Sequence, residues 1–257
     1  VQELLKAGNT GAAIPYILLA LLISAIVAGI FGIIIGIPAL RLKGDYLAII
    51  TLGFGEIIRV CIINLPDLTG GTPGLMSIPK YATFLAVYIT VVVSCVLIHM
   101  MMKSRHGRAI LSIRENEIAA EACGIHVTYY KVLAFAVSAF FAGVAGALYA
   151  GYQGLLVPSS FNFMASINIL VMVVLGGMGS MLGSIVAAAV LTALPLALQA
   201  FNTYRMVVYS VLLIAVMIFK PSGLFGQYDF SLTGLLEKLL NLRALRAARN
   251  AEKAGDA

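Results

Sequence analysis

Charged side chains are scarce in this sequence. Asp, Glu, Lys and Arg make up 11% of the 257 residues, whereas about 25% is usual for soluble domains. Hydrophobic residues make up 61%, against ~45–50% in soluble chains, and the mean hydropathy is +1.01. So few charges cannot cover a soluble surface, so the composition excludes a soluble globular protein and predicts an integral membrane protein.

The sequence also lacks the residue patterns that are typical of disulfides, metal sites and catalytic sites. The three cysteines (Cys61, Cys95 and Cys123) are widely spaced and form no Cys-x-x-Cys pair, which argues against a disulfide framework and a zinc site. The three histidines show no ligand spacing, no serine or cysteine is set near a plausible base, and no paired catalytic carboxylates occur. We therefore expect a protein that is not an enzyme and holds no metal or cofactor of its own.

The sequence is rich in long apolar runs. A crossing of the hydrocarbon core needs about 20 apolar residues in a helix, and none of the runs shows the period-two alternation of a membrane strand. No charged residue lies between Lys131 and Arg205, so we expect about three crossings there. The sequence thus predicts an all-α, polytopic membrane protein with about seven transmembrane helices, over residues 14–40, 46–65, 81–102, 132–150, 165–175, 185–200 and 206–219.

The distribution of Lys and Arg predicts the orientation, because these residues are enriched in cytoplasmic loops. If the loop 103–130 is cytoplasmic, only Lys6, Lys80 and Arg205 lie outside, and the C-terminus lies inside. The net charge of +6 then reflects topology, and we expect no nucleic-acid partner.

The first apolar run, residues 14–40, is too long for the apolar region of a cleavable signal peptide, so we expect no signal peptide. The run is also longer than one crossing needs, so we expect its helix to tilt or to end near Pro38.

The segment from Ser112 to Gly124 carries several charges between two predicted spans and is too short to cross the membrane. Ser112 followed by Glu115 matches a capping box, and Gly124 suits a left-handed helix end. One face is apolar, at Ile118, Ala122 and Ile125. The pattern predicts one short amphipathic cytoplasmic helix, which either docks into a groove on a soluble partner or rests on the headgroups.

Glu56 and Arg59 are ionisable residues within a predicted span, where a charge costs at least ~2.5–3.5 kcal/mol. Their i, i+3 spacing lets the side chains meet. They line a translocation route or a hinge at Gly53 and Gly55, or they fix the helix structurally, or they lie near the headgroups. A proton-coupling role for Glu56 would indicate a carrier that works alone.

Four further stretches stand out. Thr69–Gly74, rich in Gly and Pro, predicts a tight turn on the outer side, which could also border a gate. Gly179-x-x-x-Gly183 and Gly32-x-x-x-Gly36 predict close helix packing. In the tail, a leucine stripe with Lys and Arg over residues 231–250 predicts an interfacial helix on the inner leaflet or an ATPase contact.

Residues 107–151, GRAILSIRENEIAAEACGIHVTYYKVLAFAVSAFFAGVAGALYAG, resemble the cytoplasmic loop and following helix of ABC importer permeases for branched-chain amino acids. Glu121-Ala122-x-Gly124 is similar to the EAA-type loop that contacts ATPase subunits. Residues 38–59, 69–74, 169–188 and 219–226 resemble the M-type permease subunit of the high-affinity leucine/isoleucine/valine systems. The resemblance covers roughly residues 29–226, and family members usually carry further spans before this point.

The resemblance implies a membrane domain over residues 1–226, with a coupling loop at 103–130, and a basic cytoplasmic tail over 227–257. It implies a bacterial inner-membrane location, two ATPase partners that bind the ATP, a second permease, an extracytoplasmic binding protein, and leucine, isoleucine or valine as substrate. A urea or amide permease and an ion-coupled carrier remain alternatives. The implied coupling residues are Arg114, Glu115, Glu117, Ala119, Glu121, Ala122 and Gly124. The residues that we expect at the translocation path or gate are Gly53, Glu56, Arg59, Thr69, Gly70, Gly71 and Gly74.

Overall fold

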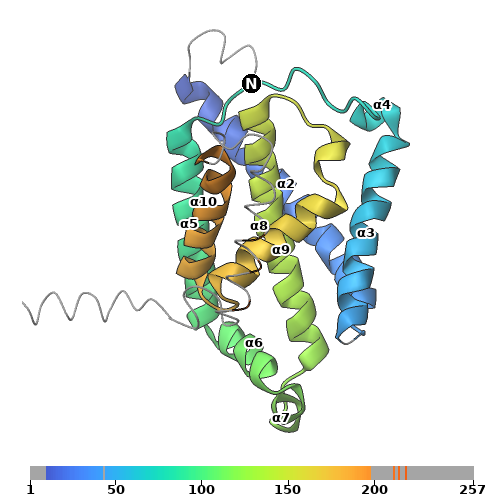
Figure 1. Cartoon of the computed structure of the whole chain (residues 1–257), viewed down its shortest axis with the longest axis vertical. Helices are drawn as coiled ribbons and strands as arrows, with labels where there is room; N and C mark the ends of the chain where they lie inside the picture. Colours follow the sequence, from blue (N-terminus) through green and yellow to red (C-terminus); the bar gives the residue numbers. More distant parts are fainter. Residues whose placement is uncertain (1–9, 43, 198–210, 212–213, 215–217, 219–257) are drawn as a thin grey trace, which may run out of the picture. The chain divides into compact units, whose positions relative to one another are not determined.

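The computed structural model describes residues 10–42 and 44–197, together with residues 211, 214 and 218. Within these residues the regular elements are helices, and β-type pairing is limited to one isolated bridge, so the all-α prediction is confirmed. Figure 1 labels helices α2 to α10 and colours them in chain order. The elements are α2 (Thr10–Ala39), α3 (Asp45–Ile63), α4 (Pro66–Thr69), α5 (Phe84–Lys103), α6 (Arg105–Glu115), α7 (Glu117–Ala122), α8 (Val127–Gln153), η1 (Pro158–Ser160), α9 (Phe163–Gly176) and α10 (Met181–Ala197).

Five of the helical segments in the described residues are long and apolar enough to cross a membrane. They are Pro15–Ala39, Tyr46–Ile63, Phe84–Lys103, Val127–Gln153 and Pro158–Gly176, and they confirm a multi-pass membrane protein. A sixth predicted run corresponds to α10, in which the shorter stretch Met181–Leu194 is apolar. The seventh run falls almost wholly outside the described residues, as does the tail 227–257, so the count of seven stays a prediction.

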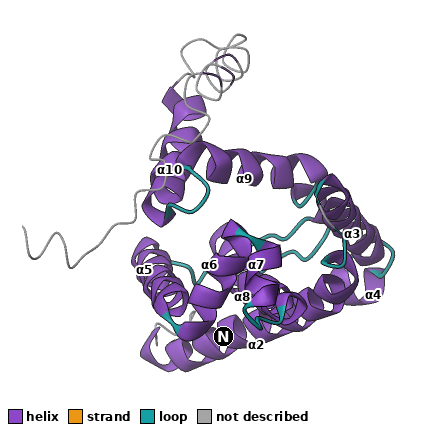
Figure 2. Cartoon of the chain, turned by 90° about the horizontal axis from the view of Figure 1, so that it is seen from below, coloured by secondary structure: helices purple, strands orange, loops and turns teal. Residues whose placement is uncertain are grey.

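The chain divides into two compact units, residues 1–166 and 167–257. In the first unit, α2 packs along α8 (Figure 2), with small residues at the contact. Ala25 is fully buried there, and the Ser24 hydroxyl donates a hydrogen bond to the Gly143 carbonyl at 2.9 Å. Gly32 approaches Ala139 so closely that an added Cβ would lie 2.5 Å from the alanine methyl. Small residues let two backbones approach in lipid, where association depends on packing, so the predicted packing at Gly32 is confirmed.

In the second unit, a sharp corner joins the end of α9 to α10. A Cβ at Gly176 would lie 2.6 Å from the Gly183 carbonyl group, and the buried Ser180 hydroxyl accepts a hydrogen bond from the Gly183 amide at 3.1 Å. Gly179 has φ 106°, a conformation that favours glycine. The backbone at Gly183 is therefore closely packed, as the Gly179-x-x-x-Gly183 spacing predicts. The residue packed against it is Gly176 of α9, whereas Gly179 lies in the turn between the two helices.

The contact between α2 and α8 gives a stability prediction. In Gly143→Ala the new methyl would lie 2.6 Å from the Ser24 carbonyl oxygen, so the helices must separate, at a cost of about 1–3 kcal/mol. Gly146, three residues along α8, is the matched control, because a methyl added there would meet nothing within 4 Å. We expect Gly143→Ala, and not Gly146→Ala, to lower the thermal unfolding temperature in detergent. Equal unfolding temperatures for both variants would contradict this packing.

Candidate functional site

The predicted amphipathic segment forms two helices. Ser112 lies in the last turn of α6, where its hydroxyl donates to the Ala109 carbonyl at 2.8 Å. Asn116 interrupts the helix with an extended backbone, and its side-chain oxygen accepts a hydrogen bond from the Ala119 amide at 3.0 Å. The predicted start at Ser112 is therefore wrong. Asn116 is the N-cap of α7, a position that asparagine strongly favours.

The predicted end of this segment is confirmed. Gly124 has φ +82° and follows the last residues of α7. Its amide donates to the Glu121 carbonyl at 2.9 Å, and the Ile125 amide donates to the Ala120 carbonyl at 3.1 Å. This pair of bonds is the Schellman arrangement, in which a left-handed residue ends a helix.

An ion pair fixes α7 to the start of α8. The Lys131 ammonium lies 2.8 Å from a Glu117 carboxylate oxygen, and the side chains are 24% and 33% exposed. Ala120 on the same short helix is buried. No local spacing rule links residues fourteen positions apart, so the sequence did not reveal this pair. Glu117, one of the implied coupling residues, therefore turns toward α8.

The opposite side of α7 is open. Ile118 is 79% exposed, so its aliphatic side chain lies on the surface. Arg114 and Glu115 form an exposed pair at 2.7 Å just before α7. The other implied coupling residues are exposed as well: Ala119, Glu121, Ala122 and Gly124. We call the exposed surface formed by Ile118, Ala119, Glu121, Ala122 and Gly124 the α7 face.

A second cluster lies at the other end of the first unit, around α4 (Figure 1). The Thr69 hydroxyl lies 2.6 Å from the Ile62 carbonyl and 2.8 Å from the Leu65 carbonyl. All three glycines that follow have φ between 65° and 75°, so the predicted turn is confirmed at Gly70, Gly71 and Gly74. Such backbone angles are accessible to glycine at little cost.

This turn leads into an extended segment that is bound to the chain after α8. Leu75 and Leu156 exchange backbone hydrogen bonds at 3.0 and 2.9 Å. The Tyr81 hydroxyl donates to the Ala147 carbonyl at 2.7 Å, and burial raises the pKa of this phenol. A Cβ at Gly151 would lie 2.5 Å from the Tyr81 ring. The segment is thus fixed to α8 at several points.

Glu56 and Arg59 meet, as their spacing predicts. The Arg59 Nε and Nη2 atoms both lie 2.7 Å from Glu56 Oε2. The other carboxylate oxygen, Oε1, accepts a hydrogen bond from the Phe163 amide at 2.8 Å. Phe163 is the first residue of α9, where a negative charge is favourable. Arg59 lies four residues before Ile63, the end of α3, and is therefore about one turn from that end.

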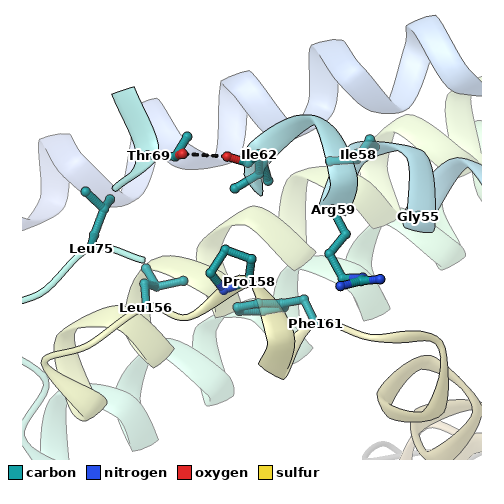
Figure 3. Close-up of a pocket in the computed structure, with 9 residues that line it drawn as sticks. All are labelled: Gly55, Ile58, Arg59, Ile62, Thr69, Leu75, Leu156, Pro158 and Phe161. Carbon is teal, nitrogen blue, oxygen red and sulfur yellow. Dashed lines mark hydrogen bonds between the residues drawn. The ribbon is translucent and has the colours of Figure 1, made fainter. Parts of the chain in front are cut away.

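Arg59 and Thr69 share a cavity of about 410 Å³. In Figure 3, Arg59 extends from α3 toward Phe161. The lining is mostly apolar and consists of Gly55, Ile58, Arg59, Ile62, Thr69, Leu75, Leu156, Pro158 and Phe161. Of the residues expected at a path or gate, the structure brings together Arg59 and Thr69, with Glu56 bonded to Arg59. Gly53 and the three turn glycines are not part of the lining.

The chain matches the family described as "Branched-chain amino acid transport system / permease component" over residues 4–217. The high-affinity branched-chain amino acid transport system permease proteins LivM of Salmonella typhimurium and Escherichia coli are each 37% identical over 236 residues, or 79% of this chain and 56% of the relative. LivH of Salmonella typhimurium, also a permease protein of a high-affinity branched-chain amino acid transport system, is 32% identical over 126 residues, 48% of this chain and 41% of that protein. No solved structure matches.

The chain therefore spans 56% of the length of the LivM relatives. All three relatives are named as transport permeases rather than as enzymes. The family match runs from residue 4 to residue 217 and includes both the α7 face and the cavity. The chain belongs to the family of permease components of branched-chain amino acid transport systems.

Proposed function

We propose that this chain is a membrane-spanning permease subunit of an ATP-driven importer for leucine, isoleucine or valine. The observation that carries the proposal is the family match over residues 4–217. The names of the LivM and LivH relatives, all permeases for branched-chain amino acids, support the substrate class. They give no support to a urea or amide permease.

In this proposal two partner ATPases bind the nucleotide, and the α7 face is their contact. The exposed Ile118 offers an apolar anchor, and Glu121 and the Arg114–Glu115 pair offer charges around it. Apolar anchors surrounded by polar groups are typical of sites that bind a partner. A second homologous permease and an extracytoplasmic binding protein complete the assembly, and the similarity to both LivM and LivH supports the second permease.

The position of α7 explains how a contact there could move the membrane helices. Ser104 both ends α5 and caps α6, so α6 follows α5 directly. On the other side, the Glu117–Lys131 pair ties α7 to α8. ATPase subunits that bind the α7 face more tightly in one state shift the population toward that state. The motion would open the transport route to one side of the membrane at a time.

The proposal places the protein in the bacterial inner membrane. The loop 103–130 and the C-terminus then face the cytoplasm, as the distribution of Lys and Arg predicts. The cavity at the far end of the first unit then faces outward, toward the binding protein. A carrier that works alone through Glu56 finds no support, because both carboxylate oxygens of Glu56 are engaged by Arg59 and the Phe163 amide.

Reconstitution of the assembly, omitting one component at a time, tests the proposal. Labelled leucine should accumulate in proteoliposomes only when this chain, its companion permease, the ATPases, ATP and the binding protein are all present. Concentrative uptake by the purified chain alone would overturn the proposal, and so would uptake that depends on the proton gradient rather than on ATP.

The α7 face gives a prediction about coupling. Ile118→Glu places a charge where the partner should bury an apolar side chain, so leucine uptake should fall at least tenfold while the protein still folds. Ile118→Leu keeps an apolar side chain at the same position and is the matched control. ATPase activity and uptake are measured in the same vesicles. Unchanged uptake by Ile118→Glu would exclude the α7 face as the contact.

The Glu117–Lys131 pair gives a second coupling prediction. The pair is partly exposed, so its loss should lower the unfolding free energy by less than ~1 kcal/mol, yet it should loosen α7 from α8. We expect Glu117→Lys and Lys131→Glu each to lower the number of leucine molecules taken up per ATP hydrolysed several-fold. The double variant with exchanged charges should recover most of that loss. No recovery would show that the ion pair does not transmit the motion.

A further inference from the structure

The cavity lined by Arg59 and Thr69 has the size of a small-molecule site. Its volume of about 410 Å³ lies in the ~300–1,000 Å³ range of ligand pockets. Ile58, Ile62 and Phe161 supply apolar walls, and Leu75 and Leu156 add to them from two other segments. Because the Leu75–Leu156 backbone pairing fixes those segments, the walls are held in place without a ligand.

Arg59 is the charged residue of the lining. Its guanidinium has five N–H donors, and the two bonds to Glu56 Oε2 leave the remaining donors without an acceptor among the described residues. Glu56 also accepts a hydrogen bond from the Phe163 amide, so the carboxylate that orients the guanidinium is itself fixed in position. A planar guanidinium with free donors matches a carboxylate, to which it can donate two parallel hydrogen bonds.

The neighbouring Glu56 limits which carboxylate compounds fit. The Glu56–Arg59 pair is neutral as a unit, so a ligand with a net charge would enter a mostly apolar cavity without full compensation. A zwitterion carries no net charge and still has a carboxylate for Arg59. The apolar walls add a preference for an apolar side chain over a polar one.

We infer that this cavity binds an L-amino acid with an apolar side chain, with its carboxylate on Arg59 and its side chain against Ile62, Leu156 and Phe161. The inference rests on the proposed import function for the identity of the amino acid. Arg59 lies about one turn from the end of α3, so the site is an entry site near the membrane surface rather than a site at the bilayer centre. It gives the permease its own means of recognising the substrate.

Ligand binding to the full-length protein in lipid nanodiscs tests this inference, with saturation-transfer NMR as the readout because it detects weak ligands. The probes are L-leucine and isoamylamine, which keeps the apolar part and the amine but lacks the carboxylate. Arg59→Gln removes the carboxylate partner, and Arg59→Lys keeps the charge. Gly55→Leu fills the cavity, because Gly55 lines it and a Cβ there meets nothing within 4 Å. Gly146→Leu adds the same side chain at an equally open position on α8, which is absent from the lining.

We expect Arg59→Gln to weaken leucine binding at least tenfold without weakening the already weaker binding of isoamylamine, because the Glu56 carboxylate left without its partner attracts the ammonium group. Arg59→Lys should restore part of the leucine affinity. Gly55→Leu should abolish binding of both probes, and Gly146→Leu should change neither. Three results would overturn the site: no leucine binding to the unmodified protein, equal leucine affinity in Gly55→Leu, or equal losses for both probes in Arg59→Gln. If leucine binding depends on Arg59 but ATP-dependent uptake is absent, the import function fails and the site stands.

Discussion

Lipid offers no hydrogen-bond partner to the backbone and no water to a charge, and this constraint shapes every part of the chain. The segments of the described residues that are long and apolar enough to cross are all helical. The ion pairs that the described residues form lie near helix ends: the Glu56–Arg59 pair lies near the end of α3, and the Glu117–Lys131 pair lies at the start of α8. The two candidate sites of the first unit, the α7 face and the cavity, thus lie at its two ends, and α2 packs on α8 between them.

The helix α8 connects these two ends. It runs unbroken for 27 residues, about 40 Å at 1.5 Å per residue. Near its start Lys131 holds α7, and near its end Ala147 and Gly151 hold the Tyr81 segment. Leu156, a wall of the cavity, lies three residues beyond the end of α8. A displacement of α7 by a partner can therefore reach the cavity through one continuous helix, which is the physical basis of the proposed coupling.

The sequence predicted the features that depend on local rules. Scarce charge and long apolar runs predicted the spans, and Gly124 was correctly predicted as a left-handed helix end. The glycines and proline of residues 69–74 predicted the turn there, and i, i+3 spacing paired Glu56 with Arg59. The break at Asn116 was missed because Ser112 and Asn116 are both good caps, and only the tertiary structure decides between them. Contacts between distant segments, such as Glu56 with the Phe163 amide, leave no periodic signal in one sequence.

The central claim is that ATPase subunits bind the α7 face. A natural cysteine beside this face allows the contact to be tested by chemical labelling. Cys123 is an exposed thiol directly after α7, whereas Cys61 and Cys95 lie in α3 and α5. With Cys61 and Cys95 replaced by serine, the rate of maleimide labelling of Cys123 can be measured in vesicles with and without the ATPase subunits. The account predicts that the ATPases slow the labelling several-fold. An unchanged labelling rate in a complex that still transports leucine would contradict it.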